Sequence, residues 1–179
     1  MNANEVLIDL LEDNRRRLHR ALSIMSDDTV LWKPDGSANN IVVTIWHMAR
    51  IFDVFLTQQA NGDSSDEVTW FRCGWAEKIG YDPRGIGQYG WGMLTGYTRE
   101  EVAAMPQMTS EQVLEYLDEV YNTVKVYLAC TSMEKLQTPA SGFDGKYTKY
   151  QCIQMALLDN VRHLGEIYAI EANWSRQIS

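Results

Sequence analysis

Basic residues are scarce in this chain of 179 residues. Sixteen lysines and arginines stand against twenty-four aspartates and glutamates, which gives a net charge of −8 at pH 7. A chain with this charge is repelled both by a nucleic-acid backbone and by an anionic membrane surface. We therefore expect neither nucleic acid nor a membrane as a partner.

Cysteines are also few, and their spacing carries information. Cys73, Cys130 and Cys152 are odd in number and form no Cys-x-x-Cys pair, which argues against a disulfide framework and against a structural zinc knuckle. We expect buried free thiols in a reducing compartment. The N-terminal stretch is acidic where a signal peptide is basic and then apolar, and no run approaches the ~20 apolar residues of a membrane span. The sequence thus predicts a cytoplasmic protein.

Four prolines, 45% apolar residues and the absence of low-complexity tracts are typical of a globular chain. The length suits one domain, so we expect a single domain over residues 1–179. Apolar residues recur at helical spacing in four stretches, at about 4–25, 37–59, 110–129 and 148–174. The second stretch is apolar on nearly every face, as in the middle of a bundle. The sequence predicts an all-α fold, an antiparallel four-helix bundle.

A long irregular connection, residues 61–108, separates the second and third predicted helices. It contains seven glycines between Gly74 and Gly96, interleaved with tryptophans and tyrosines. Only Trp75–Ile79 suggests a short helix within it. A stretch of this kind is usually functional or has short elements of its own. Two interpretations stay open: its aromatic residues cap the open end of the bundle, or they line a substrate site.

The chain contains only three histidines. His19 lies among arginines and is expected to be exposed. His47 lies in the apolar second helix, which offers it no strong partner. His163 follows Asp159 by four residues and precedes Glu166 by three, which places these polar residues on one face of the fourth helix.

Buried polar side chains are costly unless they find partners. One explanation is a metal ion held by His47, Asp159 and His163, because imidazoles and a carboxylate with an open fourth position are typical of catalytic metal sites. The other explanation is an ordinary hydrogen-bonded pair of Asp159 and His163, with His47 satisfied separately in the core. The spacing alone favours this second explanation, because D-x-x-x-H is a weak motif.

Three segments of the chain resemble the DinB-like superfamily of metal-binding four-helix bundles. They are residues 37–50 (SANNIVVTIWHMAR), 96–105 (GYTREEVAAM) and 162–167 (RHLGEI). The superfamily includes the N-terminal domain of mycothiol-dependent maleylpyruvate isomerase and related thiol S-transferases. The resemblance covers essentially the whole chain.

The resemblance implies a set of metal ligands. The family has one ligand histidine on its second helix and an H-x-x-x-H pair on its fourth. His47 matches the first ligand and His163 the last, whereas Asp159 replaces the remaining histidine. The implied site is His47, Asp159 and His163 around a divalent ion such as Zn, Ni, Fe or Mn, unless the replacement marks a lost site. Glu166 is implied either as a partner of a ligand or as a fourth ligand.

The resemblance also implies a function, a metal-dependent thiol S-transferase that uses a low-molecular-weight thiol as cosubstrate for a small-molecule substrate. A metal-dependent hydrolase is compatible with the same residues. A different interpretation is a non-catalytic, stress-associated binding or dimerisation bundle with a degenerate metal site.

We also expect a homodimer, on the basis of apolar surface. The second predicted helix is apolar on more faces than the interior of a four-helix bundle covers. Trp32, Trp46 and Trp174 add further large apolar side chains near helix ends. A two-fold interface is the commonest way to bury such a surplus.

Overall fold

A computed structural model describes residues 2–36 and 38–177. Ser37, the first residue of the predicted second helix, lies outside this part of the chain. The described residues form helices, turns and one isolated β-bridge between Pro139 and Thr148, so the prediction of an all-helical chain is confirmed. The α-helices are α1 (Ala3–Leu22), α2 (Asp27–Leu31), α3 (Ile41–Val54), α4 (Thr69–Arg72), α5 (Trp75–Ile79), α6 (Arg99–Ala103), α7 (Ser110–Cys130), α8 (Met133–Leu136) and α9 (Lys149–Gln177). A π-helix (Phe55–Asn61) continues α3, and short 3₁₀ turns cover Ser65–Glu67, Gln88–Gly90 and Phe143–Gly145.

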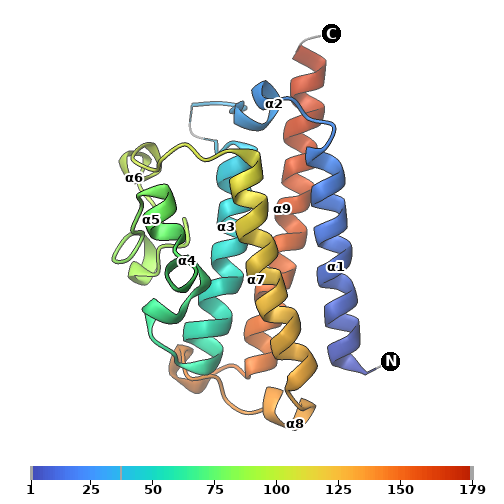
Figure 1. Ribbon diagram of the computed structural model, residues 1–179, viewed down its shortest axis with the longest axis vertical. Coiled ribbons are helices and arrows are strands. Elements are labelled where there is room, and N and C mark those ends of the chain that lie inside the picture. Colours follow the sequence, from blue (N-terminus) through green and yellow to red (C-terminus); the bar gives the residue numbers. More distant parts are fainter. Residues whose placement is uncertain (1, 37, 178–179) are drawn as a thin grey trace.

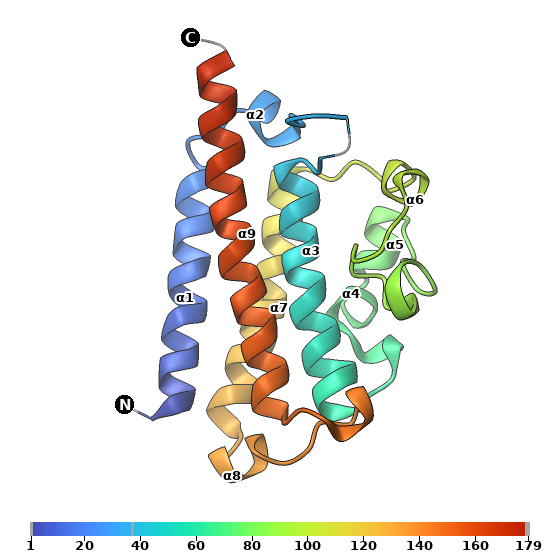
Figure 2. The same ribbon diagram turned by 180° about the vertical axis from the view of Figure 1, so that it is seen from behind.

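The long helices α1, α3, α7 and α9 lie side by side (Figures 1 and 2). Helix α3 contacts α7 and α9, and α1 contacts the same two helices. Figure 1 shows that α1 and α9 run toward one end of the molecule, whereas α3 and α7 run toward the other. The predicted antiparallel arrangement therefore needs correction, because α3 and its neighbour α7 are parallel. The physical reason is the connection at 62–109, which is long enough to return along α3 before α7 begins.

Helix α3 is the centre of the core. All its residues except Val43 are buried, because the connection covers the face that α7 and α9 leave free. Within that cover, the Trp46 ring meets Trp70 edge-on at 5.8 Å and lies 5.9 Å from the ring of Tyr81. The apolar surplus that suggested a dimer on this helix is therefore buried within the chain itself.

The helix Ile41–Asn61 is the one stretch of the described residues that is long and apolar enough to cross a membrane by length and composition. Its most apolar window is 83% buried inside the bundle. A core helix that is surrounded by its own chain has the same composition, so this finding is weak evidence for a membrane span.

A buried carboxylate fastens the first half of the connection to the bundle. Asp53 of α3 accepts hydrogen bonds from the backbone N–H groups of Thr69, at 2.7 Å, and Trp70, at 3.0 Å. It thereby satisfies two of the free N–H groups at the start of α4. The Tyr116 hydroxyl of α7 donates to the same carboxylate at 2.8 Å. Helix α4 is thus held by two long helices at once.

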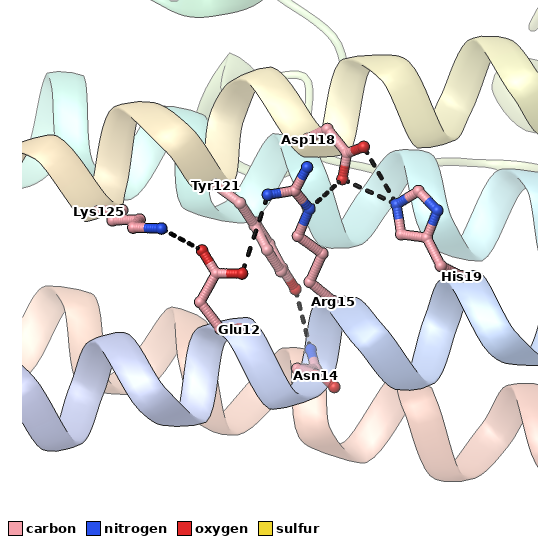
Figure 3. Close-up of polar contacts among 7 residues, drawn as sticks. All are labelled: Glu12, Asn14, Arg15, His19, Asp118, Tyr121 and Lys125. Carbon is pink, nitrogen blue, oxygen red and sulfur yellow. Dashed lines mark hydrogen bonds and ion pairs between the residues drawn. The ribbon is translucent and has the colours of Figure 1, made fainter.

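One chain of buried hydrogen bonds crosses all four long helices. Asn14 Nδ2 of α1 donates to the Tyr121 hydroxyl of α7 at 2.9 Å, a bond visible in Figure 3. That hydroxyl donates to Asn160 Oδ1 of α9 at 2.7 Å, and Asn160 Nδ2 donates to the Met48 carbonyl of α3 at 3.1 Å. Buried polar groups require such partners. This chain consequently fixes the register of α9 against α3.

Ion pairs line the seam between α1 and α7 (Figure 3). Asp118 accepts from Arg15 Nε at 2.8 Å and lies 3.0 Å from His19 Nε2, and Lys125 pairs with Glu12 at 2.8 Å. His19 is therefore half-buried and partnered, not simply exposed as the sequence suggested. The basic stretch of α1 contributes in part to packing of the bundle.

The cysteine prediction needs a similar correction. Cys152 is buried, but Cys73 and Cys130 are exposed, and all three are free thiols. The two exposed cysteines lie at the ends of α4 and α7, respectively. Helix ends face solvent more than helix centres do. The exposure of Cys73 and Cys130 therefore follows from their positions in the helices, and the residue type alone did not predict it.

Candidate metal centre

The three predicted ligands come together between α3 and α9. Nε2 of His47 and Nε2 of His163 each lie 3.5 Å from Oδ2 of Asp159. One ligand atom from each of the three residues lies within 4.8 Å of the other two. The two imidazole rings meet edge to face, with centroids 4.8 Å apart.

The donor set fits a divalent ion. In a tetrahedral zinc site, ligand atoms about 2.0–2.1 Å from the metal lie roughly 3.3–3.4 Å from one another, close to the 3.5 Å separations observed. Asp159 Oδ2 is buried, and no hydrogen-bond donor reaches it. A buried carboxylate oxygen without a partner is costly. A cation between Asp159 and the two imidazoles would satisfy that oxygen.

Both histidines are held by the nitrogen that faces away from the centre. His47 Nδ1–H donates to the backbone carbonyl of Met93, which leaves Nε2 as the nitrogen with the free lone pair. His163 Nδ1 lies 2.6 Å from Glu166 Oε2. Metal-binding histidines are usually oriented by such a bond at the second ring nitrogen. Glu166 contacts the outer side of His163, so its position fits a partner of that ligand, not a fourth ligand.

The charges of the centre favour a cation. Burial alone would raise the pKa of Asp159, but the neighbouring imidazoles of His47 and His163 outweigh it and lower that pKa. The hydrogen bond with His163 lowers the pKa of Glu166. The same bond raises the pKa of His163, although burial opposes the increase. His163 thus lies between two carboxylates. Their negative charge can be balanced either by a proton on the imidazole or by a metal ion at Nε2.

Arg50, one turn after His47, fixes the backbone that orients His47. Its side chain is 1% exposed, and Nε donates to the Gly92 carbonyl at 3.0 Å while Nη2 donates to the Trp91 carbonyl at 3.3 Å. Three successive carbonyls, those of Trp91, Gly92 and Met93, therefore bind side chains of α3. Sequence reasoning missed the role of Arg50, although a charged residue inside an apolar helix was an available signal.

A cavity of about 470 Å³ opens beside the candidate centre. Its walls are formed by α3 with its π-helical continuation, by α9, by the second half of the connection and by the 3₁₀ turn at Phe143–Gly145. Aromatic side chains dominate one part of the lining, and a charged pair marks the α9 side: Phe55, Tyr89, Trp91, Phe143, Asp159 and Arg162.

The aromatic residues of the connection fall into two groups, one buried against the bundle and one lining the cavity. Trp70 and Trp75 are buried and pack on Tyr116 of α7, with ring centroids 4.8 and 5.7 Å away. They belong to the scaffold. Tyr89 and Trp91 line the cavity, with their rings 4.7 Å apart. The short helix predicted at Trp75–Ile79 is confirmed at those residues.

Comparison with known proteins places this arrangement in a family. A family model of the DinB superfamily matches residues 10–167. The chain belongs to the DinB superfamily. This finding confirms the resemblance that the sequence motifs indicated.

One solved structure with the same fold as this DinB-superfamily protein is a conserved protein from Enterococcus faecalis. The two structures superpose with a TM-score of 0.76 at 19% sequence identity, and the match covers 96% of each chain. Identity at this level shows a shared fold alone. A search of curated proteins finds no match. The findings together support a DinB-superfamily chain with a possible metal site of His47, Asp159 and His163.

Proposed function

We propose that this protein is a metal-dependent enzyme of the thiol S-transferase type, with the metal held by His47, Asp159 and His163. The observation that carries the proposal is the buried, unpartnered Asp159 Oδ2, which lies 3.5 Å from an imidazole nitrogen on each side and borders an open cavity. A bound divalent ion supplies stabilisation of a thiolate near neutral pH and a free position for sulfur.

None of the three cysteines of the chain lines the cavity, and the pKa of two of them is raised. Burial raises the pKa of Cys152 to about 11. Burial and the nearby Glu119 raise the pKa of Cys73 as well. A reactive cysteine has the opposite property, a lowered pKa. The sulfur therefore comes from a low-molecular-weight thiol cosubstrate.

The cavity residues hold the second, electrophilic substrate. The aromatic side chains of Trp91 and Phe143 line the cavity and would reduce the contact of a bound electrophile with water. In the transfer, the thiol releases its proton to solvent and its sulfur forms a bond to the electrophilic carbon. The bond from that carbon to its leaving group breaks, and the leaving group takes the electron pair.

Metal content is the first test of this proposal. We expect close to one divalent ion per chain in protein purified without a chelator or a histidine tag, measured by elemental analysis. His47→Ala should abolish binding, because two remaining ligands hold a divalent ion poorly against water. His19→Ala is the matched control and should keep the ion. Wild-type protein that stays empty after incubation with Zn, Ni, Mn and Fe(II) would contradict the proposal.

Cobalt substitution tests the thiol chemistry. We expect that adding 2-mercaptoethanol to the Co(II) protein produces a sulfur-to-metal charge-transfer band and releases a proton, because only the thiolate ligates. A metal-dependent hydrolase on the same ligands would be active without any thiol. A non-catalytic bundle with a degenerate site would show neither the band nor activity. Either result would replace the transferase proposal.

A further inference from the structure

The charged groups of the cavity beside Asp159 are unevenly distributed. Of its twelve lining residues, ten are uncharged, and Arg162 is the single cationic one. Arg162 lies on α9 one turn beyond Leu158, and its side chain is exposed. Among the described residues its guanidinium forms no hydrogen bond and no ion pair. An arginine that faces a cavity without a partner is available to bind an anionic ligand.

The remaining lining favours a flat apolar ligand. The Trp91 ring meets Phe143 at 5.5 Å and Phe55 at 6.4 Å, and both contacts are edge to face. Aromatic side chains in this arrangement leave ring faces and edges for a further aromatic group. The cavity volume of about 470 Å³ is within the range of small-molecule sites.

The charges around this end of the cavity also favour an anionic ligand. Asp159 and Arg162 cancel each other, and Glu166 adds a negative charge beside His163. A divalent ion at the candidate centre would therefore leave this end of the cavity with one net positive charge. A planar carboxylate matches the fork of donors on a guanidinium. An anion near Arg162 and a net positive charge in a partly closed cavity is more strongly favoured than in bulk water.

We propose that this cavity binds an aromatic carboxylate, with the ring system against Trp91 and Phe143 and the carboxylate on Arg162. As a statement about the electrophilic substrate, this inference rests on the proposed transferase function. As a statement about binding, it rests on the cavity lining and Arg162, and a metal ion at the centre would strengthen it. The two statements can therefore fail separately.

A matched pair of ligands tests the proposal. Binding of 1-naphthoate and of the neutral 1-naphthamide is measured by titration calorimetry, with the metal-loaded and the chelator-stripped protein. We expect the wild-type protein to bind the acid about tenfold more tightly than the amide, the size of one charge-assisted hydrogen bond. Arg162→Gln should remove this preference by weakening the acid only, and Arg162→Lys should restore part of it.

Two further variants control for other effects. Arg176→Gln removes an exposed arginine from the same helix, away from the cavity lining, and should leave both affinities unchanged. Trp91→Leu should weaken the acid and the amide equally, because it removes ring contact but no charge. Equal loss by the two ligands would thus assign Trp91 to the apolar part of the site.

The outcomes separate this inference from the proposed function. Equal affinities for acid and amide in wild-type protein, an unchanged preference in Arg162→Gln, or no binding of either ligand at millimolar concentration would each overturn the inference. Protein that binds a metal but shows no Arg162-dependent preference would keep the proposed function and lose this inference. Protein that holds no metal yet shows the preference would keep the binding site and lose the transferase.

Discussion

His163 lies between two carboxylates, and this position determines how the centre responds to pH. Its Nδ1 is 2.6 Å from Glu166, and its Nε2 is 3.5 Å from Asp159. The hydrogen bond with Glu166 raises the pKa of His163 above its ordinary value. A metal ligand must present a deprotonated Nε2. Protons therefore compete with the metal at higher pH than they would at an ordinary histidine.

Glu166→Gln tests this competition. Metal affinity should fall as the pH decreases through the raised pKa of His163. In Glu166→Gln the pH at which half of this affinity is lost should be lower, because the variant removes the main cause of the raised pKa. At pH well above that midpoint, affinity should fall by up to about tenfold, since a neutral amide oxygen orients the ring and raises its basicity less than a carboxylate does. Competition with a chromophoric chelator between about pH 5 and pH 8 measures both effects.

The control for this experiment is Glu171→Gln, which removes a carboxylate of the same helix that bonds Ser175 instead. The pH midpoint of its metal affinity should equal that of the wild-type protein.

The effect of pH on the stability of the fold has the opposite sign to its effect on metal affinity. In metal-free protein, the raised pKa of His163 stabilises the fold below pH 6.5, and this stabilisation is lost as the pH rises through the folded-state pKa. A midpoint unchanged by Glu166→Gln would contradict the role given to Glu166.

At the scale of elements, the connection between α3 and α7 is part of the centre because its backbone holds a ligand. Gly92 has φ of +62°, and a Cβ there would lie 2.4 Å from the carbonyl oxygen of Pro83. Its own carbonyl accepts from Arg50, and the next carbonyl, of Met93, accepts from His47. A side chain at Gly92 would displace the backbone that orients His47.

Gly92→Ala should therefore reduce both stability and metal affinity. Gly85 is the matched control, because its φ is +80° but nothing lies within 4 Å of an added Cβ. Gly85→Ala should cost only the left-handed backbone, ~1–2 kcal/mol in the free energy of unfolding, and should leave metal affinity unchanged. Gly92→Ala should cost more and also weaken metal binding. Urea unfolding and chelator competition measure the two quantities, and equal effects at both glycines would refute this view of the connection.

Periodicity predicted the long helices well, but it could not specify the elements between them. The third helix, predicted at 110–129, is Ser110–Cys130. The second continues as a π-helix over Phe55–Asn61, because an apolar stretch looks the same in either geometry. Of the short helices only Trp75–Ile79 was predicted, because four or five residues carry little periodic signal, and α4 is set by a distant residue, Asp53. The direction of α7 depends on the path of the connection, which residue spacing does not encode.

In the candidate centre, too, spacing predicted what lies on one helix but not what depends on the packing of several elements. Spacing alone placed Asp159 and His163 on one face, because both lie on a single helix. Their meeting with His47 was only one of two explanations that the residues left open, and the resemblance favoured it, since the meeting depends on the register between two helices. The partner of His47 is a backbone carbonyl, at Met93. Every residue carries a carbonyl, so no residue type could have indicated this bond.

On the scale of the whole molecule, the apolar surface available to a partner is not where the sequence suggested. Helix α3 is covered by its own connection, and Trp46 is fully buried. Trp32 and Trp174 pack on each other with ring centroids 5.7 Å apart. A row of exposed apolar residues lies instead on the outer face of α9, while other exposed apolar side chains lie on α1, on α7 and in the connections. At helical spacing the row comprises Leu158, Val161, Gly165, Tyr168 and Ala169, with the exposed Arg162 and the cavity on one flank.

We propose a homodimer formed through this outer face of α9. Val161 is 50% exposed, and the small residues Gly165 and Ala169 beside it allow the close approach of a second helix. A two-fold axis would place the same face of both copies in contact, which buries the apolar residues of each at once. The proposal replaces the interface on α3 that the sequence suggested, because that helix has no apolar face left to offer.

Charge placed in the interface should separate the two copies. We expect the wild-type protein to sediment as a dimer at micromolar concentration and Val161→Lys as a monomer, because two lysines would face each other across the two-fold axis without partners. Val126→Lys is the matched control, since Val126 is 62% exposed on α7, a different helix, and it should leave the dimer intact. A monomeric wild-type protein would contradict the dimer itself. Dissociation by Val126→Lys and not by Val161→Lys would instead move the interface from α9 to α7.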